Sequence, residues 1–112
     1  MLQLNKEVSK GIIFIRIEGK LDGNNFKTFY KEINDLLYIK GMHYYVFNFI
    51  DTKVNNTNIY NKLQLILIEI FLNCGKVALC GIENNIKKNL WKRKDGLYYI
   101  NNEFEAFNYL AI

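Results

Sequence analysis

Side chains that could do covalent chemistry are scarce in this chain. It has one histidine, His43, one serine, Ser9, and two cysteines, Cys74 and Cys80. A nucleophile needs an oriented base within reach, and His43, at the start of a predicted strand, is not placed to serve one. Neither cysteine has the further ligands that a zinc site requires nearby. We therefore predict no metal site and no nucleophilic catalysis.

Two carboxylates, Asp22 and Asp51, fall in predicted loops that can share one end of a sheet. No spacing rule marks them as an acid and base pair, and the chain has no glycine-rich loop of the phosphate-binding type. The sequence thus predicts a protein that is not an enzyme and that needs no cofactor.

The residues best suited to binding lie in a stretch rich in asparagine, residues 51–58. Asn55, Asn56, Thr57 and Asn58 carry side chains that compete with the backbone for hydrogen bonds. Such residues favour a loop followed by a helix N-cap. We predict that a binding site, if the chain has one, includes this loop.

The segments on either side of the loop must hold it in place. Residues 44–50 are almost all aromatic or β-branched, which predicts a strand that is buried on both faces and central in its sheet. Residues 59–72 predict a long helix that ends at Cys74 and Gly75. Five apolar residues of this helix recur at helical spacing and form one stripe facing a core. They are Ile59, Leu63, Ile66, Leu67 and Ile70.

The same helix has a second apolar stripe, formed by Leu65, Ile68 and Leu72, roughly opposite the first. Two interpretations are open. Another helix packs against the stripe or loops partly bury it, or the stripe is a docking surface for a partner or a second copy of the chain.

The other predicted elements complete a single α/β domain, residues 1–112. Residues 2–8 and 12–18 form a hairpin, and residues 76–80 and 97–100 are strands. Asn24 or Asn25 caps a helix over residues 26–37, and residues 83–91 and 103–110 are shorter helices. The order β-β-α-β-α-β-α-β-α predicts a mixed, mostly parallel sheet packed with about four helices.

Three short sequence motifs, taken in their order along the chain, resemble a STAS domain of the anti-sigma-factor antagonist type. They are Gly-Lys-Leu-Asp at 19–22, Gly-Lys-Val-Ala-Leu at 75–79 and Phe-Glu-Ala at 104–106. The resemblance implies a small cytoplasmic switch protein. In that family a kinase phosphorylates a serine in an Asp-Ser-Ser-Gly type motif at the start of the long helix, and the unmodified protein binds an anti-sigma factor.

This chain departs from the family at the motif, where it has Asn55, Asn56, Thr57 and Asn58. Asn56 takes the acceptor position when counted from the strand, and Thr57 does so when counted back from Gly75. Either Thr57 is the acceptor or the protein is a permanently unphosphorylated binder. We favour the second interpretation, because Asn55 cannot supply the carboxylate that the motif places beside the acceptor.

The resemblance implies a protein partner, an anti-sigma factor or kinase-like regulator. Such a partner is expected to meet the loop 55–58, the loop residues Asp22, Gly23 and Asn24, and Asn61 and Leu65 on the long helix. Two alternatives are a homodimerising scaffold subunit and a binder of nucleic acid or membrane surfaces through the basic residues 87–94. Nucleic acid is the less favoured partner.

The bulk composition is that of a globular domain. The 112 residues carry a net charge of +4 and half of them are apolar. No stretch approaches the roughly 20 uncharged apolar residues of a membrane span. Residues 1–7 alternate and carry charge, which is not the pattern of a signal peptide. The expected location is the cytoplasm.

Overall fold

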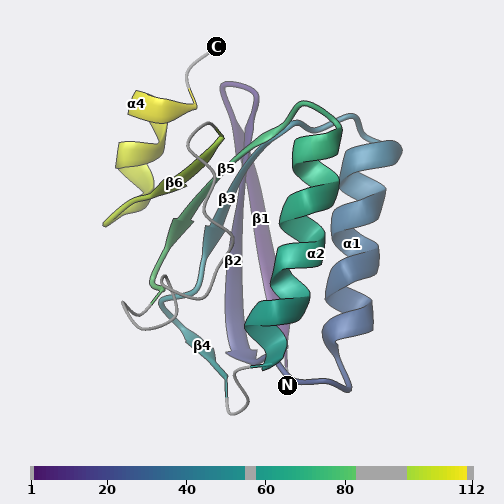
Figure 1. The fold of residues 1–112 in the computed structure, drawn as a ribbon. Coiled ribbons are helices and arrows are strands. Elements are labelled where there is room, and N and C mark those ends of the chain that lie inside the picture. The colour runs from purple at the N-terminus through teal and green to yellow at the C-terminus, as the bar shows by residue number, and fades with distance from the viewer. Residues whose placement is uncertain (1, 55–57, 83–95, 111–112) are drawn as a thin grey trace.

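The protein folds around a mixed β-sheet, as seen in a computed structural model that describes residues 2–54, 58–82 and 96–110 (Figure 1). The strand order is β1-β2-β3-β5-β6. The strands are β1 Gln3–Ser9, β2 Ile12–Lys20, β3 Tyr44–Asn48, β5 Lys76–Cys80 and β6 Leu97–Tyr99. β1 and β2 form an antiparallel hairpin, and the other neighbours in this order pair in parallel. The predicted hairpin and mostly parallel sheet are confirmed.

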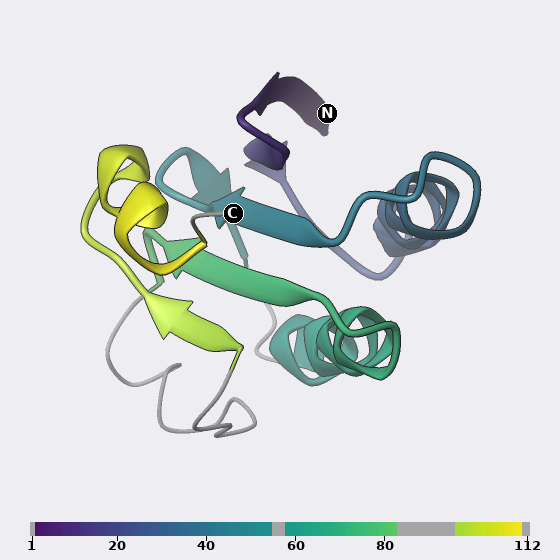
Figure 2. The same ribbon diagram turned by 90° about the horizontal axis from the view of Figure 1, so that it is seen from above.

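Helices cover both faces of this sheet. α1 (Phe26–Tyr38) and α2 (Asn58–Leu72) lie on one face, while the short η1 (Glu103–Glu105) and α4 (Ala106–Tyr109) lie on the other (Figure 2). The predicted last helix is therefore a 3-10 turn followed by one α-helical turn. The helix predicted at 83–91 lies outside the described residues. None of the helices in the described ranges is long and apolar enough to cross a membrane.

β3 is the central strand, as its composition predicts, and its side chains enter two cores. Tyr45 and Phe47 pack against α1 and α2, whereas Val46 points to the face that carries α4. Successive side chains of a strand point to opposite faces, so both faces of this strand are buried. All five residues of the first apolar stripe of α2 are buried, as predicted.

α2 ends at the predicted place, and Cys74, just after the helix, has a left-handed backbone conformation. Cys74 has φ +62, and the Gly75 N–H donates to the Ile70 carbonyl at 2.9 Å, which is a Schellman ending. Gly75 is needed for a different reason: a Cβ there would lie 2.5 Å from the His43 carbonyl oxygen.

A further short element differs from the prediction. Residues 52 and 53 were expected in a loop but form a strand, β4 (Thr52–Lys53), which pairs in parallel with the end of β2. Its two pairs, Gly19 with Thr52 and Lys20 with Lys53, extend the sheet beyond β3. A two-residue strand has too short a pattern to be seen in a sequence.

Candidate functional site

The segments that lead into the two predicted binding loops, residues 19–21 and 51–53, lie side by side at one end of the sheet. Gly19 N–H donates to the Asp51 carbonyl at 3.1 Å, and Leu21 N–H donates to the Lys53 carbonyl at 3.0 Å. Thr52 adds a side-chain bond, from Oγ1 to the Ile17 carbonyl at 2.6 Å. β4 therefore ties the chain that leads into the Asn-rich loop to the chain that leads into α1 (Figure 1).

The turn before α1 is held by Asp22 rather than by an asparagine cap. Asp22 Oδ1 accepts from the N–H groups of Asn24 and Asn25 at 2.9 and 3.0 Å. Asn25 Oδ1 accepts from the Asp22 N–H at 2.9 Å, so this side chain turns away from the helix. Asn25 is the N-cap residue but makes no side-chain cap bond, and the prediction that Asn24 or Asn25 caps α1 is wrong in this respect. Gly23 and Asn24 are exposed.

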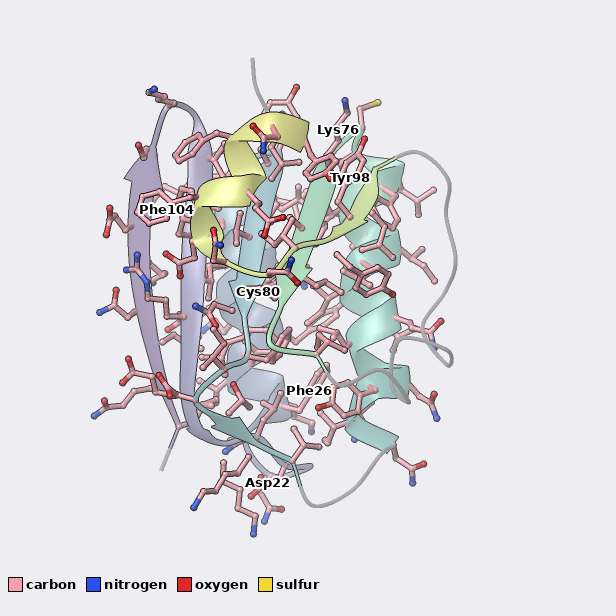
Figure 3. The ribbon with its side chains drawn as sticks, turned by 90° about the vertical axis from the view of Figure 1, so that its left-hand side faces the viewer. Asp22, Phe26, Lys76, Cys80, Tyr98 and Phe104 are labelled. Carbon is pink, nitrogen blue, oxygen red and sulfur yellow. The ribbon has the colours of Figure 1, made fainter. Side chains whose placement is uncertain are left out.

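The first turns of α1 and α2 lie next to each other at this edge. Lys62 Nζ lies 5.8 Å from the centroid of the Phe26 ring. Asn58 is the first residue of α2, and Asn58 and Asn61 are both exposed. The structure thus brings Asn58 and Asn61 to the same edge as residues 22–24, the turn labelled at Asp22 in Figure 3. Asn55, Asn56 and Thr57 lie outside the described residues.

The second apolar stripe of α2 is exposed. The side chains of Leu65, Ile68 and Leu72 are 56%, 36% and 76% exposed. The exposure of Leu65 and Leu72 argues against a helix packed over the stripe, whereas Ile68 is partly buried. They point away from the sheet, opposite the buried stripe.

The other residues considered for catalysis or metal binding do not form a cluster in the described residues. His43 is exposed at the strand start, and its backbone carbonyl accepts from the Lys76 N–H at 2.9 Å. Burial raises the pKa of the Cys80 thiol to about 11, so this cysteine is a neutral, inert thiol near pH 7. Over the described ranges, no group of three His, Cys, Asp or Glu side chains could hold a metal ion.

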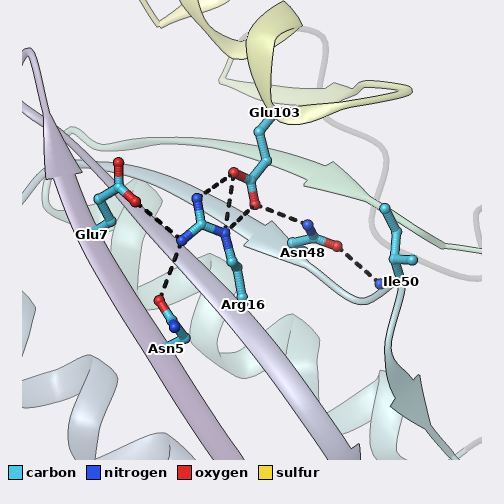
Figure 4. A network of polar contacts seen from close by, with 6 residues as sticks. All are labelled: Asn5, Glu7, Arg16, Asn48, Ile50 and Glu103. Carbon is cyan, nitrogen blue, oxygen red and sulfur yellow. Dashed lines mark hydrogen bonds and ion pairs between the residues drawn. The ribbon is translucent and has the colours of Figure 1, made fainter.

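A polar network on the opposite face was not predicted. Arg16 projects from β2, and its guanidinium donates to both carboxylate oxygens of Glu103 in η1, at 2.7 to 3.2 Å (Figure 4). It also donates to Glu7 and Asn5 of β1, at 3.2 Å each. Asn48 Nδ2 donates to Glu103 at 2.9 Å. The network fastens the C-terminal segment to the hairpin.

The sequence contains one indication of this network: Arg16 is the one charged residue in the apolar run from Ile12 to Ile17. A charge in a buried strand needs a partner. Its partner could not be identified, because Glu103 is 87 residues away in sequence.

The Glu103 carboxylate is stabilised in its charged form. Partial burial raises its pKa, but hydrogen bonds from Arg16 and Asn48 and the positive charge of Arg16 lower it, and the net result is a lowered pKa. The hydrogen bond to Glu103 in turn raises the pKa of Arg16. Arg16 is therefore charged at every pH at which the protein would be studied.

We expect Glu103→Gln to lower the free energy of unfolding by about 1–2 kcal/mol near neutral pH, the scale of lost charge-assisted hydrogen bonds. The contribution of Glu103 is fully present above its unfolded pKa, near 4.5, and is lost as pH falls through the lower folded value. Urea unfolding at a series of pH values measures it. The difference between the two proteins should be constant from about pH 6 to 8 and shrink below about pH 4.

Glu18→Gln is the matched control, since Glu18 lies on the same face of β2, two residues beyond Arg16. It should change the free energy of unfolding by less than about 0.5 kcal/mol. A difference for Glu103→Gln that persists unchanged to about pH 3 would contradict an ionised Glu103 as the source.

No protein-family model matches this sequence, and no curated protein sequence matches it significantly. Solved structures do match. The anti-sigma factor antagonist SpoIIAA in its unphosphorylated form is 17% identical, with 96% of each chain covered and a TM-score of 0.74. SpoIIAA of Bacillus, a cell fate determinant, in its phosphorylated form is 16% identical, with a TM-score of 0.72 over 96% of this chain and 97% of that one.

A serine-to-glutamate variant of RsbS from Moorella thermoacetica is 15% identical, with a TM-score of 0.76 over 96% of this chain and 94% of that one. At this level of identity the likeness establishes the fold. The chain has the STAS fold, as its sequence predicts.

Proposed function

We propose that this STAS-fold domain is a regulatory protein-binding module of the anti-sigma-factor antagonist kind, and not an enzyme. It binds an anti-sigma-type partner through the loop 55–58 and the outer face of α2, and it does so without serine phosphorylation. The observation that carries the proposal is the exposed apolar stripe, Leu65, Ile68 and Leu72, on the helix that follows the loop.

The stripe has the spacing of a helix that docks into an apolar groove. Its residues stand at i, i+3 and i+7, the anchor positions of helix-in-groove recognition. Burying a leucine side chain is worth roughly 1.5–3 kcal/mol, so three such anchors supply a large part of the binding energy of a specific complex. Their exposure in the free domain supports a role in binding.

The polar residues of the site extend this surface towards the sheet edge. Asn61 lies one turn before Leu65 on α2, and the turn at residues 22–24 stands beside the start of that helix. A partner that covers α2 would meet this turn as well. Apolar anchors bordered by exposed asparagines match the usual anatomy of an interface, with an apolar centre and a polar rim.

The loop 55–58 has no serine, so it cannot be switched by serine phosphorylation. SpoIIAA has been solved in both phosphorylated and unphosphorylated forms. Here the only serine in the sequence, Ser9, ends β1 beside the hairpin turn, at the end of the sheet opposite the start of α2 (Figure 1). A phosphate disrupts an interface only where its charge is brought into contact with that interface. We infer a binder that is permanently unphosphorylated; phosphothreonine at Thr57, found by mass spectrometry of the protein from cells, would contradict this.

We expect Leu65→Asp to abolish partner capture without unfolding the domain. The full chain is used to capture proteins from the native cytoplasm at low salt and at about 1 M NaCl, where the Debye length is about 3 Å. Mass spectrometry identifies the captured proteins. The wild type should retain a kinase-like or anti-sigma-type regulator at high salt, because apolar docking survives screening, whereas Leu65→Asp should lose it at least tenfold.

Phe104→Asp is the matched control: it also replaces an exposed apolar side chain by aspartate, but on the opposite face of the sheet. It should capture the partner as the wild type does. Unchanged capture by Leu65→Asp would place the interface elsewhere, and loss of the cooperative unfolding transition would make Leu65 part of the core. If light scattering instead shows a dimer that Leu65→Asp dissociates, the stripe joins two copies of the chain.

A further inference from the structure

A second candidate binding site lies on the face of the sheet that carries η1 and α4. It is a cleft of about 270 Å³ between these C-terminal elements and the hairpin β1–β2. Its volume is slightly below the roughly 300–1,000 Å³ of most small-molecule sites, so it suits a small ligand. This face is opposite α2, so a ligand bound in the cleft would not touch the surface that we propose for partner binding.

Strand register explains how the cleft acquires both polar and aromatic walls. Asn5, Glu7 and Ser9 alternate along β1 and therefore project on one face. Glu7 stands directly opposite Phe14 of β2, in the same register that places Asn5 opposite Arg16. Glu7, Ser9, Phe14 and Arg16 line the cleft from the sheet side.

The aromatic wall is completed from the C-terminal segment. Phe104 and Phe107 line the cleft, and the Phe107 ring centroid lies 5.6 Å from that of Phe14. Phe104 is 83% exposed, the highest exposure among the large apolar side chains of the described residues. A ligand that covered this ring would remove apolar surface from water, which favours binding.

The charges of the cleft select a cation. All three guanidinium nitrogens of Arg16 are engaged, by Glu103, Glu7 and Asn5 (Figure 4). Both Glu103 oxygens are engaged as well. Glu7 bonds Arg16 through Oε1, and its side chain is 60% exposed, so its carboxylate is the charged group most open to a ligand. An anion would meet that carboxylate and an arginine that is already occupied.

Lys10 sets the orientation of such a ligand. Its ammonium lies 5.4 Å from the centroid of the Phe107 ring, at the hairpin-turn end of the cleft. A ligand cation at that end would be repelled, so the favourable place for it is beside the Glu7 carboxylate, away from the hairpin turn. The apolar part of the ligand then lies against Phe14 and Phe104.

We propose that this cleft binds a small primary amine carried by a short chain on an aromatic or similar apolar group. The ammonium donates to the Glu7 carboxylate, and the ring packs between the phenylalanines. A hydrogen bond between two charged groups has about twice the strength of a neutral one, so the charge is the main source of selectivity.

The test is a ¹H–¹⁵N NMR titration of the full chain with phenethylamine, compared with phenethyl alcohol, which has the same ring and chain but no charge, and with phenylacetate. Phenethylamine should cause saturable shifts confined to residues 5–9, 14–16 and 103–107. It should bind about tenfold more tightly than the alcohol, the ratio expected for one charge-assisted hydrogen bond. Phenylacetate should not bind there.

Two variants localise the charge. Glu7→Gln should weaken phenethylamine binding about tenfold and leave the affinity for the alcohol unchanged. Glu18→Gln removes a carboxylate from the same face of the hairpin but outside the cleft and should leave both affinities unchanged. Shifts elsewhere in the protein, equal affinity for amine and alcohol, or unchanged amine affinity in Glu7→Gln would overturn the proposal. The spectra themselves report whether each variant is folded.

Discussion

Replacing Phe47 by alanine is expected to lower the free energy of unfolding by about 4 kcal/mol, near the top of the range for large core truncations. Phe47 lies in the middle of the central strand and is fully buried. Its ring meets three other aromatic rings, those of Tyr45, Phe29 and Phe49, at centroid distances of 5.9, 6.1 and 6.4 Å. Aromatic pairs of this kind add roughly 0.5–1.5 kcal/mol each to the burial of area.

Urea unfolding, followed by circular dichroism, measures the loss. Phe104→Ala makes the same change at an exposed position and should alter the free energy of unfolding by less than about 0.5 kcal/mol. A loss below about 1.5 kcal/mol in Phe47→Ala would mean that the surrounding rings collapse into the space, and that the aromatic cluster does not centre on this residue.

The main core was predictable because its signals are local. The spacing of Ile59, Leu63, Ile66, Leu67 and Ile70 defines one face of a helix. The composition of residues 44–50 predicts a strand buried on both faces, which the structure forms over Tyr44–Asn48, two residues shorter than predicted, with Ile50 exposed. Each pattern needs only its own segment and the period of its backbone. The order of elements then restricts the sheet to few topologies.

The second stripe of α2 could not be assigned in the same way. Periodicity places Leu65, Ile68 and Leu72 on one face but carries no information about what lies outside that face. Whether the stripe is core or surface depends on a further layer, which is a property of the tertiary structure. The structure leaves these three side chains exposed.

Contacts distant in sequence were also beyond prediction. The Arg16–Glu103 pair joins the second strand to the C-terminal segment, and the cleft beside it exists only because η1 and α4 pack next to the hairpin.

The sequence predicts a side-chain-stabilised turn before α1 but not which side chain stabilises it, because Asp22, Asn24 and Asn25 can all form such a turn. Only the backbone path decides that Asp22 makes the bonds.

The second large effect concerns Gly81, where β5 ends against the turn that leads to β4 and the Asn-rich loop. Gly81 has φ +79, and a Cβ there would lie 2.4 Å from the Ile50 nitrogen and 2.8 Å from the Phe49 carbonyl carbon. These are backbone atoms, so no side chain can rotate to relieve the contact. We expect Gly81→Ala to lower the free energy of unfolding by about 3 kcal/mol or more. The alanine would be strained in a left-handed backbone conformation, and its Cβ would push the backbone of Phe49 and Ile50 away.

Two other glycines separate these two causes. Gly41 has φ +68 but open space around its Cβ position, so Gly41→Ala should cost only the backbone strain, about 1–2 kcal/mol. Gly23 has neither a left-handed φ nor a close neighbour, and Gly23→Ala should change stability by no more than about 1 kcal/mol. Thermal or urea unfolding of the three variants gives the series, and equal losses in Gly81→Ala and Gly41→Ala would show that the close approach to Ile50 contributes nothing.

Gly81→Ala also tests how the proposed interface is held. The turn that Gly81 supports includes the hydrogen bond from the Thr52 N–H to the Phe49 carbonyl at 3.1 Å, and it leads through β4 into the loop 55–58. Displacing Phe49 and Ile50 would therefore move the loop relative to α2, while Leu65 stays in place. At a temperature where the variant remains folded, we expect partner capture to weaken, though less than in Leu65→Asp. Capture equal to that of the wild type would assign the interface to the apolar stripe alone.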